Sequence, residues 1–222
     1  DIWTSSKARA FMVSEKLAVV TGASRGLGRE LAKTLIQEGY TVVGFSRTAP
    51  QGLVLQWEQA DLVSGKDLIR ATTFLKELPQ IDVLVNNAAT AQTPVWVETL
   101  APSEWQRLLW LNLYVPFRLI STVLPGMKRR SSGTIVNISS YCGRRAIPNH
   151  AAYCASKFAL RGLTEAVAKE LGQWWSRDTG PCPIHIFSAS PSGMNTAMRA
   201  QLFGAAEAAQ QQDPTWVAER IG

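Results

Sequence analysis

Tyr153 and Lys157 are the residues of this 222-residue chain whose types and spacing point most directly to chemistry. They stand four positions apart on a predicted helix, so both side chains lie on one helical face. A phenol normally loses its proton near pH ~10, and a cation about 4 Å away stabilises the phenolate by ~4 kcal/mol at an effective dielectric of ~20. The pair predicts a tyrosine that acts as an acid or base near neutral pH. By itself it also fits an ordinary helix.

A glycine-rich turn near the start of the chain predicts a phosphate site. It follows the apolar run 17–20, typical of a buried strand, and precedes a segment of helical period over 29–38. Glycines let the backbone approach a pyrophosphate, and a helix N-terminus favours the anion. The spacing is Gly-x-x-x-Gly-x-Gly, not the general Gly-x-Gly-x-x-Gly. The residues of this turn expected at a cofactor are Gly22, Ser24, Arg25, Gly26, Leu27 and Gly28.

The residues after the second predicted strand indicate which cofactor binds. A free ribose 2′-hydroxyl is usually held by an acid at this place, yet positions 41–56 contain no Asp or Glu. Arg47 stands there instead, and Arg25 lies in the glycine turn. With Ser24 and Ser46 these guanidinium groups suit a 2′-phosphate. We therefore expect NADP(H) rather than NAD(H), although Arg47 could also be an ordinary surface arginine.

Two later apolar stretches end in polar residues, where the ligand crevice of an open parallel sheet lies. The stretch 81–86 leads into Asn87, and the stretch 134–139 leads into Ser140, thirteen residues before Tyr153. Ser140 could donate a hydrogen bond to a substrate oxygen beside the tyrosine. Asparagines and serines at strand ends are also common as turns and caps, so their assignment depends on the neighbouring motifs.

Asn112 is a polar residue inside the apolar helical segment 108–117. A buried amide needs hydrogen-bond partners. Pro116 follows four residues later and has no N–H to give to the Asn112 carbonyl. The pair predicts a kink and a free carbonyl at Asn112, in a purely structural or a functional role.

In their order along the chain these motifs resemble the short-chain dehydrogenase/reductase superfamily, from about position 17 to position 196. By this resemblance Tyr153 is the proton donor or acceptor, and Ser140 orients and polarises the carbonyl. Lys157 lowers the tyrosine pKa and, with Tyr153, contacts the cofactor. Asn112 holds a water that relays protons to the lysine. The further cofactor contacts that the resemblance implies are Asp61, Leu62, Asn87, Ala88, Ala89, Pro191, Ser192 and Thr196.

The sequence departs from the family pattern in three places. Ala89 replaces the last glycine of Asn-Asn-Ala-Gly, and Ser192 replaces the glycine of Pro-Gly. The sequence ends at Gly222, before the seventh strand that the family normally has. The segment 213–219 is similar to the start of the helix that precedes that strand. We expect either a trimmed tail or a partner chain that covers the edge.

The fold class expected is α/β, a single doubly wound Rossmann-type domain over 1–222 with helices on both faces of a parallel sheet. Residues 1–15 form an N-terminal extension, and 190–212 form the substrate-loop region. The strand order is 3-2-1-4-5-6, without a seventh strand. Strands are predicted near 17–21, 41–46, 54–60, 81–86, 134–139 and 183–189, and helices near 26–38, 64–77, 103–129, 151–175 and 197–211.

The expected substrate is a carbonyl compound, bulky and partly aromatic or cyclic, or the corresponding alcohol. His150 could bond a second polar group of it, although a surface position at the helix start is an equal reading. A cyclic imine as substrate and a cofactor-binding sensor without chemistry are the alternatives, and the complete Ser-Tyr-Lys-Asn set argues against the sensor. The candidate substrate contacts are Ala91, Tyr141, Cys142, His150, Met194 and Met198, with Ala89, Trp96, Arg144, Ile147 and Phe203 as further pocket candidates.

Bulk composition fits these expectations. The net charge of +6 comes from scattered residues, and the run 128–130 follows a helix end, so we expect no nucleic-acid partner. The apolar region 108–127 is interrupted by polar residues and a proline, so we expect no membrane span. Three cysteines without a Cys-x-x-Cys pair favour a reducing cytoplasm, and no metal site is evident. By resemblance, helices 103–129 and 151–175 would join a homodimer or homotetramer.

Overall fold

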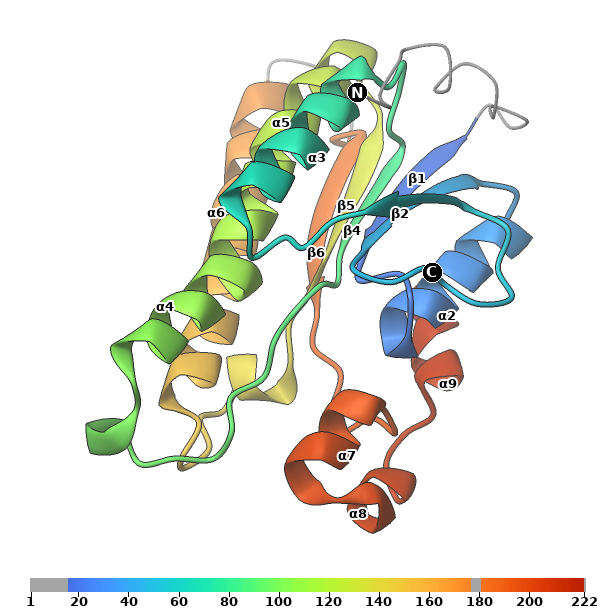
Figure 1. Cartoon of the computed structure of the whole chain (residues 1–222). Coiled ribbons are helices and arrows are strands. Elements are labelled where there is room, and N and C mark those ends of the chain that lie inside the picture. Colours follow the sequence, from blue (N-terminus) through green and yellow to red (C-terminus); the bar gives the residue numbers. More distant parts are fainter. Residues whose placement is uncertain (1–15, 177–180, 222) are drawn as a thin grey trace.

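Six parallel strands form one sheet in the order β3-β2-β1-β4-β5-β6, which confirms the predicted topology (Figure 1). The computed structural model describes residues 16–176 and 181–221, so the extension predicted over 1–15 lies outside the described residues. No seventh strand occurs in the described part. The strand bounds are β1 Leu17–Thr21, β2 Thr41–Ser46, β3 Gln56–Gln59, β4 Val83–Asn86, β5 Gly133–Ile138 and β6 Ile184–Ala189.

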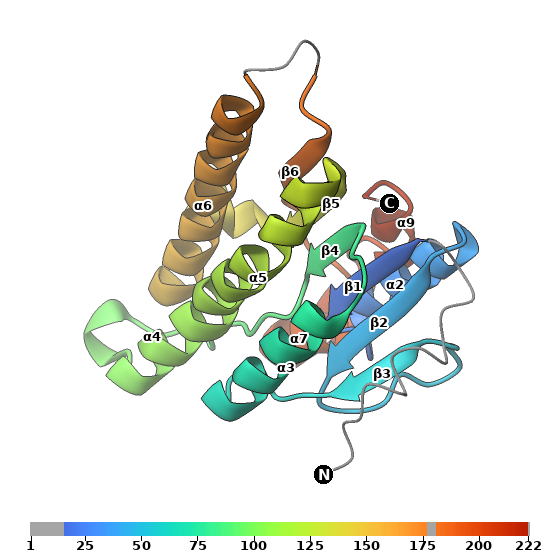
Figure 2. The ribbon, with the colours of Figure 1, turned by 90° about the horizontal axis from the view of Figure 1, so that it is seen from above.

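The inner strands are buried on both faces because helices cover both sides of the sheet (Figure 2). All five residues of β1 are buried, as expected for a short apolar run in a parallel sheet. One face packs against α2 and α9, and the other packs against α3, α5 and α6. The helix bounds are α2 Gly26–Gln37, α3 Gly65–Glu77, α4 Pro102–Leu109, α5 Val115–Arg130, α6 Ala151–Trp175, α7 Ala197–Phe203, α8 Ala205–Ala209 and α9 Pro214–Ala218.

The helical stretch predicted over 103–129 changes geometry where Asn112 and Pro116 suggested a kink. Between α4 and α5 the turn Trp110–Tyr114 is π-helical, and Pro116 lies in the first turn of α5. π-Turns are frequent at functional sites. The whole run 102–130 is long and apolar enough to cross a membrane by length and composition alone, with 39% of its most apolar window buried inside the protein. A core helix passes the same test.

The single helix predicted over 197–211 is wrong. Gly204 adopts φ +91° and separates α7 from α8. A positive φ ends an α-helix, and glycine adopts it without steric cost. The chain then returns, and Asn195 N donates to Gln212 O at 2.9 Å, which joins the two ends of this region. α9 follows where the segment 213–219 suggested a helix start, and its Val217 is buried on the α2 side of the sheet.

Candidate active site

A cleft of about 620 Å³ lies at the carboxyl ends of the strands, bounded by the residues after β1, β2, β4 and β5 and by α7. It brings together most of the predicted cofactor residues. Those that line it are Gly22, Ser24, Arg25, Gly26, Leu27, Gly28, Ser46, Arg47, Asp61, Leu62, Asn87, Ala88, Ala89, Tyr153, Lys157 and Thr196, with Ala91, Met194 and Met198 from the substrate set. Those outside its lining are Asn112, Ser140, Tyr141, Cys142, His150, Pro191 and Ser192.

The glycine turn is closely packed and is held by hydrogen bonds from the end of β4. Gly22 has φ +70°, and a Cβ on Gly28 would lie 2.2 Å from Asn87 Nδ2 and 2.3 Å from the Gly22 oxygen. The turn can therefore close only without side chains. Asn87 Nδ2 donates to Thr21 O at 2.9 Å, and Thr21 Oγ1 accepts from Asn87 N at 3.0 Å. The sequence did not predict this role of Thr21, because no motif distinguishes it from any other threonine at the end of a strand. The close-packed turn at the start of α2 fits a dinucleotide pyrophosphate.

The residues predicted to contact a 2′-phosphate differ in whether their hydrogen-bond donors face the cleft. Arg25 and Arg47 line it with exposed side chains. Ser46 instead donates its hydroxyl proton to Thr48 O at 2.8 Å and accepts from Trp57 Nε1 at 3.1 Å. A phosphate oxygen needs hydrogen-bond donors, and the Ser46 hydroxyl gives its proton to Thr48 O, so the two arginines remain the predicted donors.

Tyr153 lies in the cleft, and the Ser140 hydroxyl is near enough to lower the pKa of its phenol. Desolvation by burial raises the pKa of Tyr153 to about 12, against the smaller lowering effect of Ser140. Ser140 Oγ also accepts from Cys142 N at 3.2 Å, at the start of the short helix Tyr141–Gly143. The serine is thus held in reach of the phenol although it does not line the cleft itself.

Lys157 is 2% exposed, and its Nζ donates to Ile138 O at 2.8 Å. Burial lowers the pKa of Lys157 to about 8. The sequence predicted that this cation would lower the pKa of Tyr153, and the net shift is in the opposite direction. The ammonium lies 5.8 Å from the ring centroid of Tyr153 and faces a carbonyl, so desolvation of the phenol outweighs its field.

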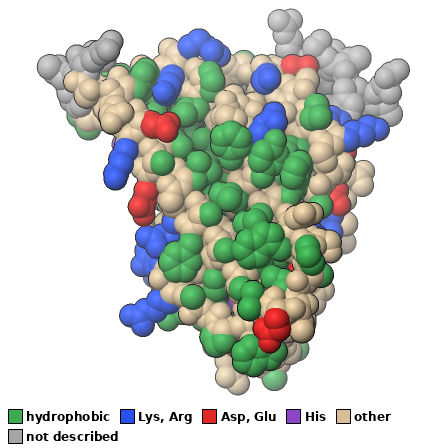
Figure 3. All heavy atoms as spheres, turned by 90° about the vertical axis from the view of Figure 1, so that its left-hand side faces the viewer, with side chains coloured by type: hydrophobic (Ala, Val, Ile, Leu, Met, Phe, Trp, Pro, Cys, Tyr) green, Lys and Arg blue, Asp and Glu red, His purple; other side chains and the backbone are tan. Residues whose placement is uncertain are grey.

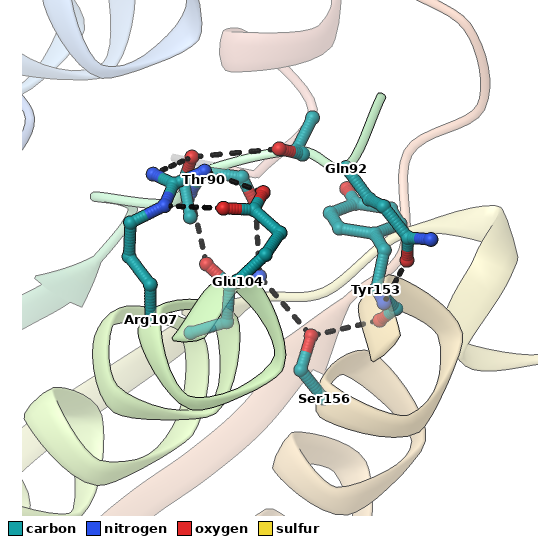
Figure 4. A network of polar contacts seen from close by, with 8 residues as sticks. Thr90, Gln92, Glu104, Arg107, Tyr153 and Ser156 are labelled. Carbon is teal, nitrogen blue, oxygen red and sulfur yellow. Dashed lines mark hydrogen bonds and ion pairs between the residues drawn. The ribbon is translucent and has the colours of Figure 1, made fainter. Parts of the chain in front are cut away.

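Asn112 has the partners that its burial required. Its Oδ1 accepts from Thr90 N at 2.9 Å, and its Nδ2 donates to Thr90 O at 2.9 Å and to Ser156 Oγ at 3.1 Å. Ser156 Oγ in turn donates to Tyr153 O at 2.7 Å (Figure 4). The side chain therefore joins the loop after β4 to α6, while the water-holding role of its carbonyl stays a prediction.

The loop after β4 carries two contacts that sequence reasoning missed. Arg107 Nη1 of α4 donates to Thr90 Oγ1 at 2.7 Å. Gln92 Oε1 accepts from Tyr153 N at 3.1 Å (Figure 4). No motif marks Gln92, because its partners are backbone atoms. Arg107 pairs with Glu104 three residues earlier, a pattern typical of a solvated helix face.

His150 stands at the start of α6 and is 7% exposed, which excludes the surface reading. Its Nδ1 lies 2.9 Å from Pro148 O, so that nitrogen carries the proton. In the neutral imidazole Nε2 is then an acceptor, and among the described residues it is buried without a partner. The ring stacks on Phe203 of α7 at 6.1 Å between centroids. Arg199 covers Phe203 at 4.8 Å.

The family of the chain follows from sequence comparison. A family model described as short chain dehydrogenase matches residues 16–207. The chain belongs to the short-chain dehydrogenase/reductase family. It is thus an oxidoreductase for carbonyl or alcohol substrates, with the NAD(P)(H) cofactor typical of such enzymes. Within residues 16–176 and 181–221, no group of three or more His, Cys, Asp or Glu side chains lies close enough to bind a metal ion.

Named relatives of this short-chain dehydrogenase differ in substrate and cofactor. The NADPH-dependent pterin aldehyde reductase of Arabidopsis thaliana is 29% identical over 92% of this chain and 86% of that protein. A short-chain dehydrogenase of Shigella flexneri, solved with NADP, is 26% identical with a TM-score of 0.79, over 94% of this chain and 92% of that one. A 3-ketoacyl-(acyl-carrier-protein) reductase of Brucella melitensis, solved with NADH, is 25% identical with a TM-score of 0.80, over 93% and 89%.

Proposed function

We propose that this enzyme uses NADPH to reduce a ketone or aldehyde of a small, cyclic or aromatic metabolite, or catalyses the reverse alcohol oxidation. The observation that carries the proposal is the position of Tyr153 in the cleft, with the Ser140 hydroxyl and the buried Lys157 beside it. A phenol held beside a hydroxyl donor is suited to protonate a carbonyl oxygen. NADPH, when bound, supplies the hydride for the carbonyl carbon.

The chain's own groups handle the proton. Because burial raises the pKa of Tyr153, the phenol is fully protonated at neutral pH and can act as the acid. Ser140 donates a hydrogen bond to the carbonyl oxygen and places it at the phenol. As the proton moves to that oxygen, the phenolate left behind gains stabilisation from the Lys157 ammonium. In alcohol oxidation the same groups act in reverse.

The choice of NADPH over NADH is supported by the charges of the cleft. Arg25 and Arg47 line it with exposed side chains. The strand end of β2 offers no acid for a ribose 2′-hydroxyl. The planar guanidinium group of arginine presents several N–H donors that match the oxygens of a phosphate better than the two hydroxyls of a ribose. The NADPH dependence in the name of the Arabidopsis relative agrees with this choice.

His150 supports a substrate with a second polar group. Its Nε2 is an acceptor that is buried and unpartnered among the described residues, and such an atom is costly unless a ligand uses it. His150 lies three residues before Tyr153, and Phe203 beside it offers an aromatic face. A carbonyl compound with a ring and a hydroxyl or N–H group could pack against Phe203 and donate to His150 Nε2.

We also propose that the enzyme assembles as a homodimer or homotetramer in a reducing cytoplasm. Hydrophobic side chains gather on the face of α4, α5 and α6 (Figure 3), where Trp105, Phe117 and Phe158 are exposed. Such a face favours a second copy. The three cysteines are all free thiols. Light scattering should give a dimer or tetramer that Phe117→Glu dissociates, and a monomeric wild type would contradict the assembly.

Two alternatives share this site. An imine substrate would use the same proton donor, and a cofactor-binding sensor would use the cleft without chemistry. The test is NADPH consumption with a panel of aromatic and cyclic ketones, aldehydes and imines, with Tyr153→Phe as control. We expect turnover of a carbonyl compound that the variant loses. Turnover of imines alone, or NADPH binding without any turnover, would contradict the proposal.

A further inference from the structure

Gln92 is a fully buried polar side chain in the loop between β4 and α4. Both ends of its amide are used. Oε1 accepts from Tyr153 N at 3.1 Å, and Nε2 donates to Asn149 O at 3.2 Å. Burying an amide costs free energy unless its hydrogen bonds are made. These two bonds therefore hold Gln92 in one orientation, and both go to the backbone at the start of the helix that carries Tyr153.

The start of α6 needs such a partner. The first N–H groups of any helix have no acceptor within the helix, and a side chain at the N-cap usually supplies one to the third helical residue. The N-cap of α6 is His150, and its side chain makes no cap hydrogen bond. The third helical residue is Tyr153, and its N–H is bonded by Gln92, 61 positions earlier in the chain. Gln92 thus serves as the cap of α6 from another element.

The loop that carries Gln92 is itself fixed on its other side. Thr90 is held through both its N–H and its carbonyl by the side chain of Asn112. Its hydroxyl accepts from Arg107, which also makes two hydrogen bonds to Glu104 at 2.7 and 2.8 Å (Figure 4). Thr90 and Arg107 line the cleft. Gln92 therefore connects the wall of the cleft to the backbone N–H of Tyr153, while Asn112 and Ser156 connect the same wall to the Tyr153 carbonyl.

We propose that Gln92 is a positioning residue, which sets the place of Tyr153 relative to the cleft wall by capping α6 from the loop after β4. The inference rests on the proposed function, since it assigns Gln92 to the placement of the proton donor. A displacement of about 1 Å in a reacting group can cost about 100-fold in rate. Loss of the Gln92 bonds should thus act on catalysis more than on cofactor binding.

The test is Gln92→Leu, which keeps the size of the side chain and removes both hydrogen bonds. We expect kcat to fall about 10–100-fold, while the Kd of NADPH, measured by fluorescence, changes less than about threefold. Amide hydrogen exchange should lose protection in the peptide 149–156 and keep it in the sheet. This exchange readout needs no substrate, so it remains informative if no carbonyl compound is turned over, which would contradict the proposed function alone.

Two further variants separate positioning from general stability. Thr164 lies on the same helix α6, far from its start, and Thr164→Val removes the buried hydrogen bond that it accepts from Asn137 of β5. It should lower Tm and leave kcat within about twofold. Gln92→Glu keeps an acceptor for Tyr153 N–H but loses the donor to Asn149 O, so kcat should fall in this variant as well. If Gln92→Leu does not fold, kcat and amide exchange of Gln92→Glu test the proposal. An unchanged kcat together with unchanged exchange over 149–156 in the folded variants would overturn the proposal.

Discussion

Lys157 Nζ donates to the carbonyl oxygen of Ile138 at 2.8 Å, at the last residue of β5. The ammonium is thus buried at the end of the sheet. The hydrogen bond to Ile138 O compensates only part of the free energy lost when the charge leaves water. The pKa of Lys157, lowered by burial to about 8, records that cost. Burial of this lysine sacrifices stability for a cation near the phenol.

Replacement of this lysine should therefore stabilise the protein and abolish its activity. In Lys157→Met an apolar side chain of similar length fills the same space. We expect Tm at pH 7 to rise by about 2–10 °C, since a buried charge is removed. Scanning calorimetry measures it, and Lys169→Met, which changes an exposed lysine of the same helix, should leave Tm unchanged. A lower Tm in Lys157→Met would contradict the stability cost.

The stability of the wild type should also depend on pH in a window set by Lys157. Its pKa is lowered from 10.5 to about 8 on folding, so between these values the unfolded chain binds more protons than the folded one. Unfolding free energy then rises with pH across that window. The rise should be absent in Lys157→Met. Urea unfolding at a series of pH values tests this, and equal slopes in both proteins would disagree with it.

The rate of carbonyl reduction should decline above about pH 8. The phenol keeps its proton far beyond that pH because burial raises the pKa of Tyr153 to about 12. Lys157 loses its charge near pH 8 in the same site, and a neutral amine no longer stabilises the forming phenolate. The pH profile of kcat/KM reports groups of the free enzyme. A profile that stays flat up to pH 10 would exclude Lys157 as the controlling group.

Arg47 should control the preference for NADPH. Arg47→Ala removes one of two guanidinium groups beside the expected 2′-phosphate, so we expect the Kd of NADPH to rise about 10–100-fold, as loss of a charged hydrogen bond costs about 1.5–3 kcal/mol. The Kd of NADH should change less than about twofold. Arg129→Ala, an exposed arginine at the end of α5, is the matched control. Equal losses for both cofactors would show that Arg47 does not read the phosphate.

His150 should decide which substrates are preferred. His150→Phe keeps an aromatic ring against Phe203 and removes the Nε2 acceptor. For paired ketones with and without a neighbouring hydroxyl, we expect the wild-type preference for the hydroxylated member to fall at least about tenfold in kcat/KM, in line with about 1–3 kcal/mol for an unpaired buried group. An unchanged ratio would mean that Nε2 does not meet the substrate.

The sequence predicted the strand order and the glycine turn because these depend on local patterns. The run 17–20 reads as a strand, and Gly22 and Gly28 stand where a Cβ would collide. It could not predict the direction of the Tyr153 pKa shift. Spacing shows that Lys157 shares a helical face with the phenol, but desolvation depends on residues brought in from β5 and the loops.

Other parts of the site depend on contacts between distant segments. Gln92 reads as an ordinary loop glutamine, since its partners are the backbone atoms of a helix 61 residues away. The ring of His150 contacts Phe203 of α7, which stands far from it in the sequence. Gly204 was available as a signal for the break between α7 and α8, because an isolated glycine often ends a helix.

The most direct test of the central claim is deuterium transfer from nicotinamide-deuterated NADPH, followed by mass spectrometry of the product. With a carbonyl substrate from the panel, the wild type should place one deuterium on the former carbonyl carbon. Tyr153→Phe should still bind NADPH and form no deuterated alcohol. A wild type that binds NADPH but labels no compound, or a Tyr153→Phe variant that labels as fast as the wild type, would contradict the account.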